Sequence, residues 1–256
     1  MTTVLAFDIE TVPDVAGIRR IHGLPDDLAD REVAEIAFQI RRVRTGSDFL
    51  PPQLQRVVVV SCVMRSDEGL KVFSLEGDEK DVIQRFYSGL EKYVPQLVSW
   101  NGGGFDLPVL NYRGLIHGVA APQFWETGDE NRDFRYNNYV SRYHTRHLDL
   151  MDVLAMYQPR NNAPLDEVAQ LAGLPGKIGV GGAKVWETFL AGEHSKIRDY
   201  CEADTVNTYL LYLRYQLLRG IHSKDALRKE EGIVRDYLKA QNKPHWAEFL
   251  KLWNAA

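Results

Sequence analysis

Residues 5–14 read LAFDIETVPD, so two acidic side chains, Asp8 and Glu10, lie in an apolar run. The composition of residues 3–10 is typical of a central strand, and residues two apart on a strand point to the same face. Burying an unpaired polar group costs roughly 2–7 kcal/mol, and burying a charge costs more. This stretch is therefore either a strand that runs out into solvent near Pro13, or a strand whose acids serve a buried ligand.

The chain has 256 residues, of which 45% are hydrophobic and 26% are charged, and its net charge is −4. These values predict a globular protein with its own core and without a general attraction for nucleic acid. The two cysteines, Cys62 and Cys201, form no CxxC pair, so we expect neither a disulfide nor a zinc site. With no secretory signal and no membrane span expected, the predicted location is the cytoplasm.

The strand pattern predicts a mixed sheet. A hairpin of two strands follows the first strand after an insertion, and two further strands alternate with helices, which is typical of an α/β fold. The five expected strands are residues 3–10, 56–65, 70–75 and 96–100, and a strand that begins at 147.

Helical periodicity covers most of the remaining chain. The insertion at 14–50 contains helical stretches, notably around 29–44, where Ile36, Ile40 and Val43 are spaced on one face. Other helices are expected over 78–94, about 106–117 and about 195–219. We expect residues 1–220 to form one domain, and residues 221–256 a helical appendage that docks on it through Trp246, Phe249, Leu250 and Trp253.

Two other segments place acids beside structured turns. In SWNGGGFD, residues 99–106, Asp106 opens a helix after three glycines, and it is either a helix cap or a functional carboxylate. In YCEAD, residues 200–204, Tyr200 and Asp204 lie four apart on one helix face. That face is largely apolar, whereas Arg198, Asp199 and Glu202 supply a polar face, so Asp204 is either a buried paired acid or part of a site.

The four carboxylates converge if the sheet and the late helix pack together. Clustered carboxylates raise one another's pKa unless a cation lies between them. Hard oxygen ligands suit Mg²⁺ or Mn²⁺, and two such ions promote hydrolysis of a phosphodiester. The sequence therefore predicts a divalent-metal site formed by Asp8, Glu10, Asp106 and Asp204.

FDIET, NGGGFD and YCEAD resemble, in order and approximate separation, the three motifs of DEDD (DnaQ-like) 3′–5′ exonucleases. The tyrosine four residues before the last aspartate resembles the DEDDy branch. Together with HLDLMDVL, LDEVAQLAGLPGK and DTVNTYLLYLR, the pattern is similar to predicted exonucleases related to the proofreading domain of family-B DNA polymerases. The resemblance covers roughly residues 1–220 and implies a ribonuclease H-like fold.

The resemblance also implies roles for individual residues. Asp8, Glu10 and Asp204 would hold one cation, Asp8 would bridge to a second, and Asp106 would assist mostly through water. Tyr200 would orient the attacking water, because a phenol with a pKa of about 10 is a poor base at neutral pH. The product would be a 5′-mononucleotide released from a single-stranded 3′ end.

Predicted substrate contacts lie around this site and on a basic loop. Asn101, Gly103 and Phe105 follow the fourth strand, and Thr11 follows the first. Arg135 and Arg142 belong to a segment with interleaved tyrosines, which is either a single-strand binding surface or an ordinary polar loop.

The expected partners and cofactors are single-stranded nucleic acid, with DNA favoured, and two divalent cations, without an organic cofactor. An exoribonuclease and a non-catalytic nucleic-acid-binding module are the alternatives. His147 and Asp149 are expected to be structural, with Asp149 as a possible support for the site.

Overall fold

The first strand, β1 (Val4–Pro13), lies at the centre of a five-stranded sheet. The structure is a computed structural model that describes residues 2–179 and 181–255. The strand order is β3-β2-β1-β4-β5, with antiparallel pairing among β1, β2 and β3 and parallel pairing among β1, β4 and β5. The other strands are β2 (Gln55–Ser66), β3 (Gly69–Leu75), β4 (Gln96–Ser99) and β5 (His147–Asp149). The predicted five-stranded mixed sheet is confirmed.

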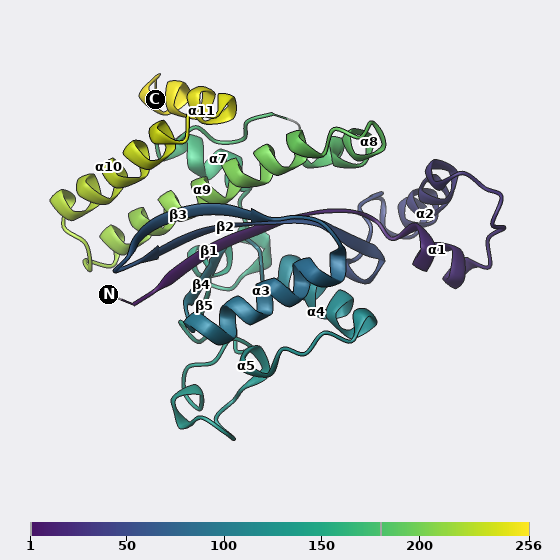
Figure 1. Cartoon of the computed structure of the whole chain (residues 1–256), viewed down its shortest axis with the longest axis horizontal. Helices are drawn as coiled ribbons and strands as arrows, with labels where there is room; N and C mark the ends of the chain where they lie inside the picture. The colour runs from purple at the N-terminus through teal and green to yellow at the C-terminus, as the bar shows by residue number, and fades with distance from the viewer. Residues whose placement is uncertain (1, 180, 256) are drawn as a thin grey trace.

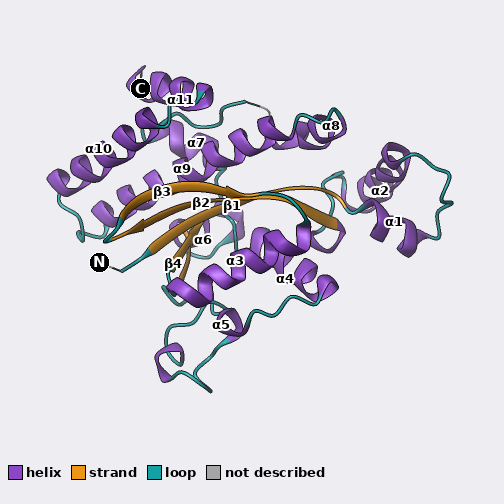
Figure 2. Ribbon diagram, viewed as in Figure 1, coloured by secondary structure: helices purple, strands orange, loops and turns teal. Residues whose placement is uncertain are grey.

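Helices cover both faces of this sheet (Figures 1 and 2). On one face lie α3 (Glu79–Tyr93), α4 (Asp106–His117) and the short α5 (Pro122–Trp125). On the other lie α7 (Leu165–Leu171), α8 (Val185–Leu190), α9 (His194–Leu218), α10 (Lys224–Ala240) and α11 (Pro244–Ala255). A single turn, α6 (Leu150–Leu154), follows β5 directly.

The side chains of β1 point alternately to the two faces of the sheet, and each face has its own hydrophobic core. Leu5, Phe7 and Ile9 pack in the cluster formed with α3 and α4, whereas Val4 and Ala6 pack in the cluster formed with α9. Because side chains alternate between faces, Asp8 and Glu10 continue the column that faces α9.

The insertion between β1 and β2 projects beyond the end of the sheet in Figure 1. It contains α1 (Val15–His22) and α2 (Asp30–Thr45). Along the predicted face of α2, Ile36 and Ile40 are half-buried, whereas Val43 is 88% exposed. The fully buried residues are Val33, Ala34 and Ala37, and Val33 and Ala37 pack in one cluster with Ile18 of α1.

The tail beyond residue 220 shares the core of the α9 layer. Trp246, Phe249 and Trp253 are buried in one cluster with Val63, Tyr209 and other residues of the sheet and α9, as the apolar stripe predicted. The division of the chain at residue 220 stays a prediction. Within the described residues, no helix has the length and apolar character needed to cross a membrane.

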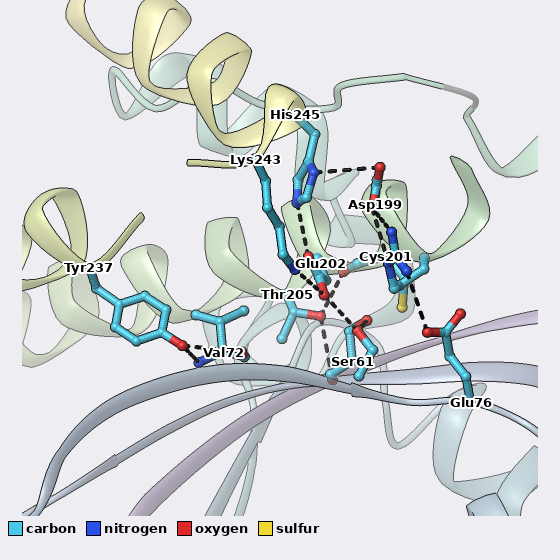
Figure 3. A network of polar contacts seen from close by, with 12 residues as sticks. Ser61, Val72, Glu76, Asp199, Cys201, Glu202, Thr205, Tyr237, Lys243 and His245 are labelled. Carbon is cyan, nitrogen blue, oxygen red and sulfur yellow. Dashed lines mark hydrogen bonds and ion pairs between the residues drawn. The ribbon is translucent and has the colours of Figure 1, made fainter. Parts of the chain in front are cut away.

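The tail also packs beside α9 and β3 where Glu202 lies, and this corrects the prediction for Glu202. That residue is only 2% exposed, rather than part of a solvated face. It accepts hydrogen bonds from Ser74 Oγ at 3.0 Å and Lys243 Nζ at 3.3 Å, and His245 Nε2 lies 2.9 Å from it (Figure 3). Burial opposes ionisation of Glu202, but these partners outweigh it and hold its pKa below the ordinary value.

Replacing Trp246 by Ala should lower the free energy of unfolding by about 3–5 kcal/mol, because a fully buried indole is removed from the shared core. Urea denaturation measures this change. The matched control is Leu218→Ala at the exposed end of α9, where we expect a change within about 0.5 kcal/mol. Equal effects of the two substitutions would show that the tail does not stabilise the fold.

Candidate active site

The predicted carboxylates come together where β1, α4 and α9 meet. The β1–β4 pairing ends at Ala6, which leaves the next part of that strand edge open. The backbone N–H of Ile9 donates there to Asp106 Oδ1 at 3.1 Å. Asp106 therefore lies beside the strand that carries Asp8 and Glu10, as the convergence of the motifs predicted.

Tyr200 and Asp204 approach the same point from α9. Both are buried, and the Tyr200 hydroxyl interacts with the Asp204 carboxylate. Cys201, between them on the helix, donates its thiol to Asp8 Oδ2 at 3.6 Å. Burial raises the pKa of this thiol, so Cys201 is a neutral donor rather than a thiolate ligand. The sequence placed Cys201 on the inner face of the helix but gave no signal for its contact with Asp8.

The electrostatics of this cluster disfavour four free negative charges. Burial, followed by repulsion from neighbouring acids, raises the pKa of Asp8 and Glu10 well above the ordinary value. Burial also raises the pKa of Asp106 to about 7 and that of Asp204 to about 6. Asp204 Oδ1 is buried without a hydrogen-bond partner in the described structure. A divalent cation would satisfy these oxygens, and Asp8, Glu10 and Cys201 form one of two groups with metal-like spacing.

Lys177 is a cationic neighbour of the site that sequence reasoning missed. Its ammonium lies 5.8 Å from the centre of the Tyr200 ring, and its charge lowers the pKa of Glu10 and Asp204 against the effect of burial. Gly176, immediately before it, has φ +71°, and a Cβ there would lie 2.5 Å from Asp166 Oδ1. The PGK sequence could have indicated a tight turn, but not the direction of the lysine.

The turn after β4, residues 100–105, is held by Asp149. The N–H groups of Asn101 and Gly103 both donate to the Asp149 carboxylate at 2.9 Å. Asp149 is therefore a support for this turn. Because those N–H groups are occupied, a substrate contact at Asn101 or Gly103 would use the Asn101 side chain or the carbonyl groups. His147 is buried, and its Nε2 atom lies 2.8 Å from Ser99 Oγ, which fits the structural role expected for it.

The other residues predicted to contact the substrate do not share one environment. Thr11 Oγ1 donates to Gln55 at 3.1 Å, and Phe105 precedes α4 at the edge of the cluster. Arg142 forms an ion pair with Asp152 at 2.8 Å, and Arg135 lies over the Tyr136 ring at 5.8 Å. The two arginines thus belong to the neighbouring loop rather than to the carboxylate cluster.

The five-stranded mixed sheet, with two acids on its central strand and helices on both faces, is the arrangement expected of a ribonuclease H-like fold. Residues 47–253 match the family described as predicted 3′–5′ exonucleases related to the exonuclease domain of PolB. The chain belongs to this family, and is thereby related to a hydrolase. The matched range contains Asp106, Tyr200 and Asp204, while Asp8 and Glu10 precede it.

Several DNA polymerases are similar to this chain. It is 25% identical over 197 residues to a DNA polymerase of Archaeoglobus fulgidus, a match covering 73% of this chain and 24% of that one. It is 25% identical over 259 residues to the catalytic chain of DNA polymerase epsilon from Aspergillus fumigatus, covering 92% and 10%. The chain thus spans about a tenth to a quarter of the length of these relatives.

A solved structure shows the same fold. The family B DNA polymerase from the hyperthermophilic archaeon Pyrobaculum calidifontis aligns with a TM-score of 0.51 and 21% identity, covering 85% of this chain and 25% of that one.

The raised pKa values predict how pH changes the stability of the metal-free protein. A carboxyl whose folded pKa is raised stabilises the fold below its unfolded pKa, and this contribution is lost as pH rises through the folded pKa. For Asp106 the interval runs from 3.8 to about 7. We therefore expect the unfolding temperature without metal to fall as pH rises from about 5 to 8.

Adding Mg²⁺ or Mn²⁺ at pH 8 should reverse this loss, by about 2.7 kcal/mol at a concentration of 100 times Kd. Calorimetry measures both effects. Asp8→Asn should weaken both the pH effect and the metal effect. Glu68→Gln, on the exposed β2–β3 turn, should leave both effects unchanged. A metal effect of the same size in Asp8→Asn would contradict this account of the cluster.

Proposed function

We propose that this chain hydrolyses the terminal phosphodiester of single-stranded nucleic acid, with DNA favoured, in the 3′–5′ direction and with two divalent cations. The product is a 5′-mononucleotide. The observation that carries the proposal is the convergence of half-buried Asp8 and Glu10 with buried Asp106 and Asp204 next to Tyr200. Family membership supports the reaction class.

Asp8, Glu10 and Asp204 would hold one cation, with Asp8 shared with a second and Asp106 nearby. The raised pKa values and the unpartnered Asp204 Oδ1 atom fit this role, because each describes an acid in need of positive charge. Bound cations lower the pKa of a water and stabilise the leaving oxygen.

The side chains of the protein bind and orient the reactants. Burial and the neighbouring acids raise the pKa of Tyr200 above its ordinary value, so its hydroxyl stays protonated. It can therefore orient a water through a hydrogen bond and cannot serve as a base. Lys177, on the exposed side of Tyr200, supplies positive charge near the position of the phosphate. Cys201 and the Ile9 N–H hold Asp8 and Asp106 in place.

Substrate and polarity are tested together with matched DNA and RNA oligonucleotides, labelled at the 5′ or the 3′ end, in Mg²⁺ and in Mn²⁺. We expect stepwise shortening from the 3′ end of single strands, faster on DNA, with release of 5′-mononucleotides. Asp8→Ala should abolish it by removing a cation ligand, with Glu68→Gln as the matched control.

Undiminished metal-dependent hydrolysis by Asp8→Ala would falsify the assignment. Retention of intact strands by the unmodified protein would favour the binding module instead, and faster shortening of RNA would favour the exoribonuclease.

The arginine loop provides a separate prediction. Arg135→Ala combined with Arg142→Ala should weaken single-strand binding and flatten its salt dependence, because each phosphate contact contributes about 0.7 to the slope of log K against log salt. The Arg142–Asp152 pair is exposed, so its loss should change stability by less than about 1 kcal/mol. Fluorescence anisotropy across a salt series measures the slope, and an unchanged slope would exclude this loop from the interface.

A further inference from the structure

A cavity of about 480 Å³ borders the carboxylate cluster on the side of the insertion. Glu10 and Thr11 of β1 line it, together with Phe49 of the insertion and the segment 182–187 that leads into α8. Gly182, in that segment, lies next to the Tyr200 hydroxyl, since a Cβ there would be 4.0 Å from it. The volume lies within the range of small-ligand sites and suits one nucleotide rather than a duplex end.

We propose that the 14–50 insertion forms the nucleobase wall of the active site, with Phe49 stacking on the base of the 3′-terminal nucleotide. This inference rests on the proposed function. It assigns the insertion, whose role the catalytic motifs do not explain, to recognition of the substrate.

The backbone of Phe49 is hydrogen-bonded on both sides, although its side chain is 59% exposed. Its N–H donates to Ser47 Oγ at 3.2 Å, and its carbonyl accepts from Arg41 Nε at 3.2 Å. A ring this exposed gains little from core burial. A rigid backbone that presents a large aromatic surface to a cavity is suited to stacking.

The ring lies close to the reacting groups. The centres of the Phe49 and Phe105 rings are 5.1 Å apart at an interplanar angle of 48°, and Phe105 immediately precedes Asp106. A base held against Phe49 therefore leaves its sugar and phosphate on the side of Glu10 and Asp106.

The charges that line the cavity also favour a base over a phosphate. Asp48, Glu10 and Glu187 line it, and no Lys or Arg is among its described lining residues. Away from the cations proposed at Glu10, Asp48 and Glu187 would repel phosphate oxygens but not an uncharged aromatic base. Phe38 and Trp186 add further apolar surface to the lining.

Two connections hold the wall against the rest of the protein. Gln55 joins β1 to the insertion, because its Oε1 accepts from Thr11 Oγ1 at 3.1 Å and its Nε2 donates to the Leu50 carbonyl at 3.0 Å. On the far side, Arg31 of α2 forms an ion pair with Glu187 of α8. The cavity thus lies between segments that the structure connects on both sides.

The test compares single-stranded oligonucleotides that end in an ordinary nucleotide or in an abasic residue at the 3′ end. The unmodified protein should favour the ordinary end by about 5- to 100-fold in kcat/KM, the range expected for one stacked base. Phe49→Ala should lose most of this preference by slowing the ordinary end, with the abasic end unchanged within about twofold. Phe49→Trp should retain the preference, and so should the control Val43→Ala on the exposed end of α2.

Two results would overturn the inference while the proposed function stands: Phe49→Ala retains the full preference, or it slows both substrates equally, as a merely structural role would. If the unmodified protein cleaves neither substrate, the proposed function fails and the inference fails with it.

Discussion

The clustering of four acids at one junction, two of them buried and two half-buried, is the constraint on which this structure depends. Asp8 and Glu10 lie at the centre of the sheet, and α4 and α9 each add a carboxylate to the same point. Glu202, on the same helix as Asp204, is a buried acid that has all its partners within the protein. Glu202 has a hydroxyl, an ammonium and an imidazole as partners, and its pKa is lowered. Asp204, two residues later, has a raised pKa and an unpartnered oxygen. The protein's own groups balance the charge of Glu202, whereas one oxygen of Asp204 has no partner among the described residues.

Two serines connect Glu202 to the strand that pairs with β1 opposite Asp8. Glu202 accepts a hydrogen bond from Ser74, and the Ser74 hydroxyl lies 2.9 Å from that of Ser61, the residue opposite Asp8 in the β1–β2 register (Figure 3). Lys243 and His245 attach the tail to the other side of Glu202. The tail therefore does more than cover apolar surface, because it stabilises the helix that presents Tyr200 and Asp204.

The sequence was sufficient for the parts of the site that depend on local spacing. The period of two put Asp8 and Glu10 on one face of a strand, and the period of four put Tyr200 beside Asp204. Features that depend on packing between residues far apart in the chain could not be predicted from the sequence. Glu202 looked solvated because nothing in its own helix reveals that the tail covers it. Lys177 reaches the site through a turn whose direction depends on Asp166. Val43 is exposed because α2 meets α1 earlier along the helix, where Val33 and Ala37 pack in one cluster with Ile18.

The most direct test of the central claim is the anomalous scattering of crystals grown with Mn²⁺, because the described structure contains two groups with metal-like spacing. One is at Asp8 and Glu10, and the other is Asp199, Glu202 and His245. This account predicts anomalous peaks between Asp8, Glu10 and Asp204, and none at Glu202, whose charge Lys243 and His245 already balance. A peak at Glu202 with an empty Asp8 cluster would contradict it.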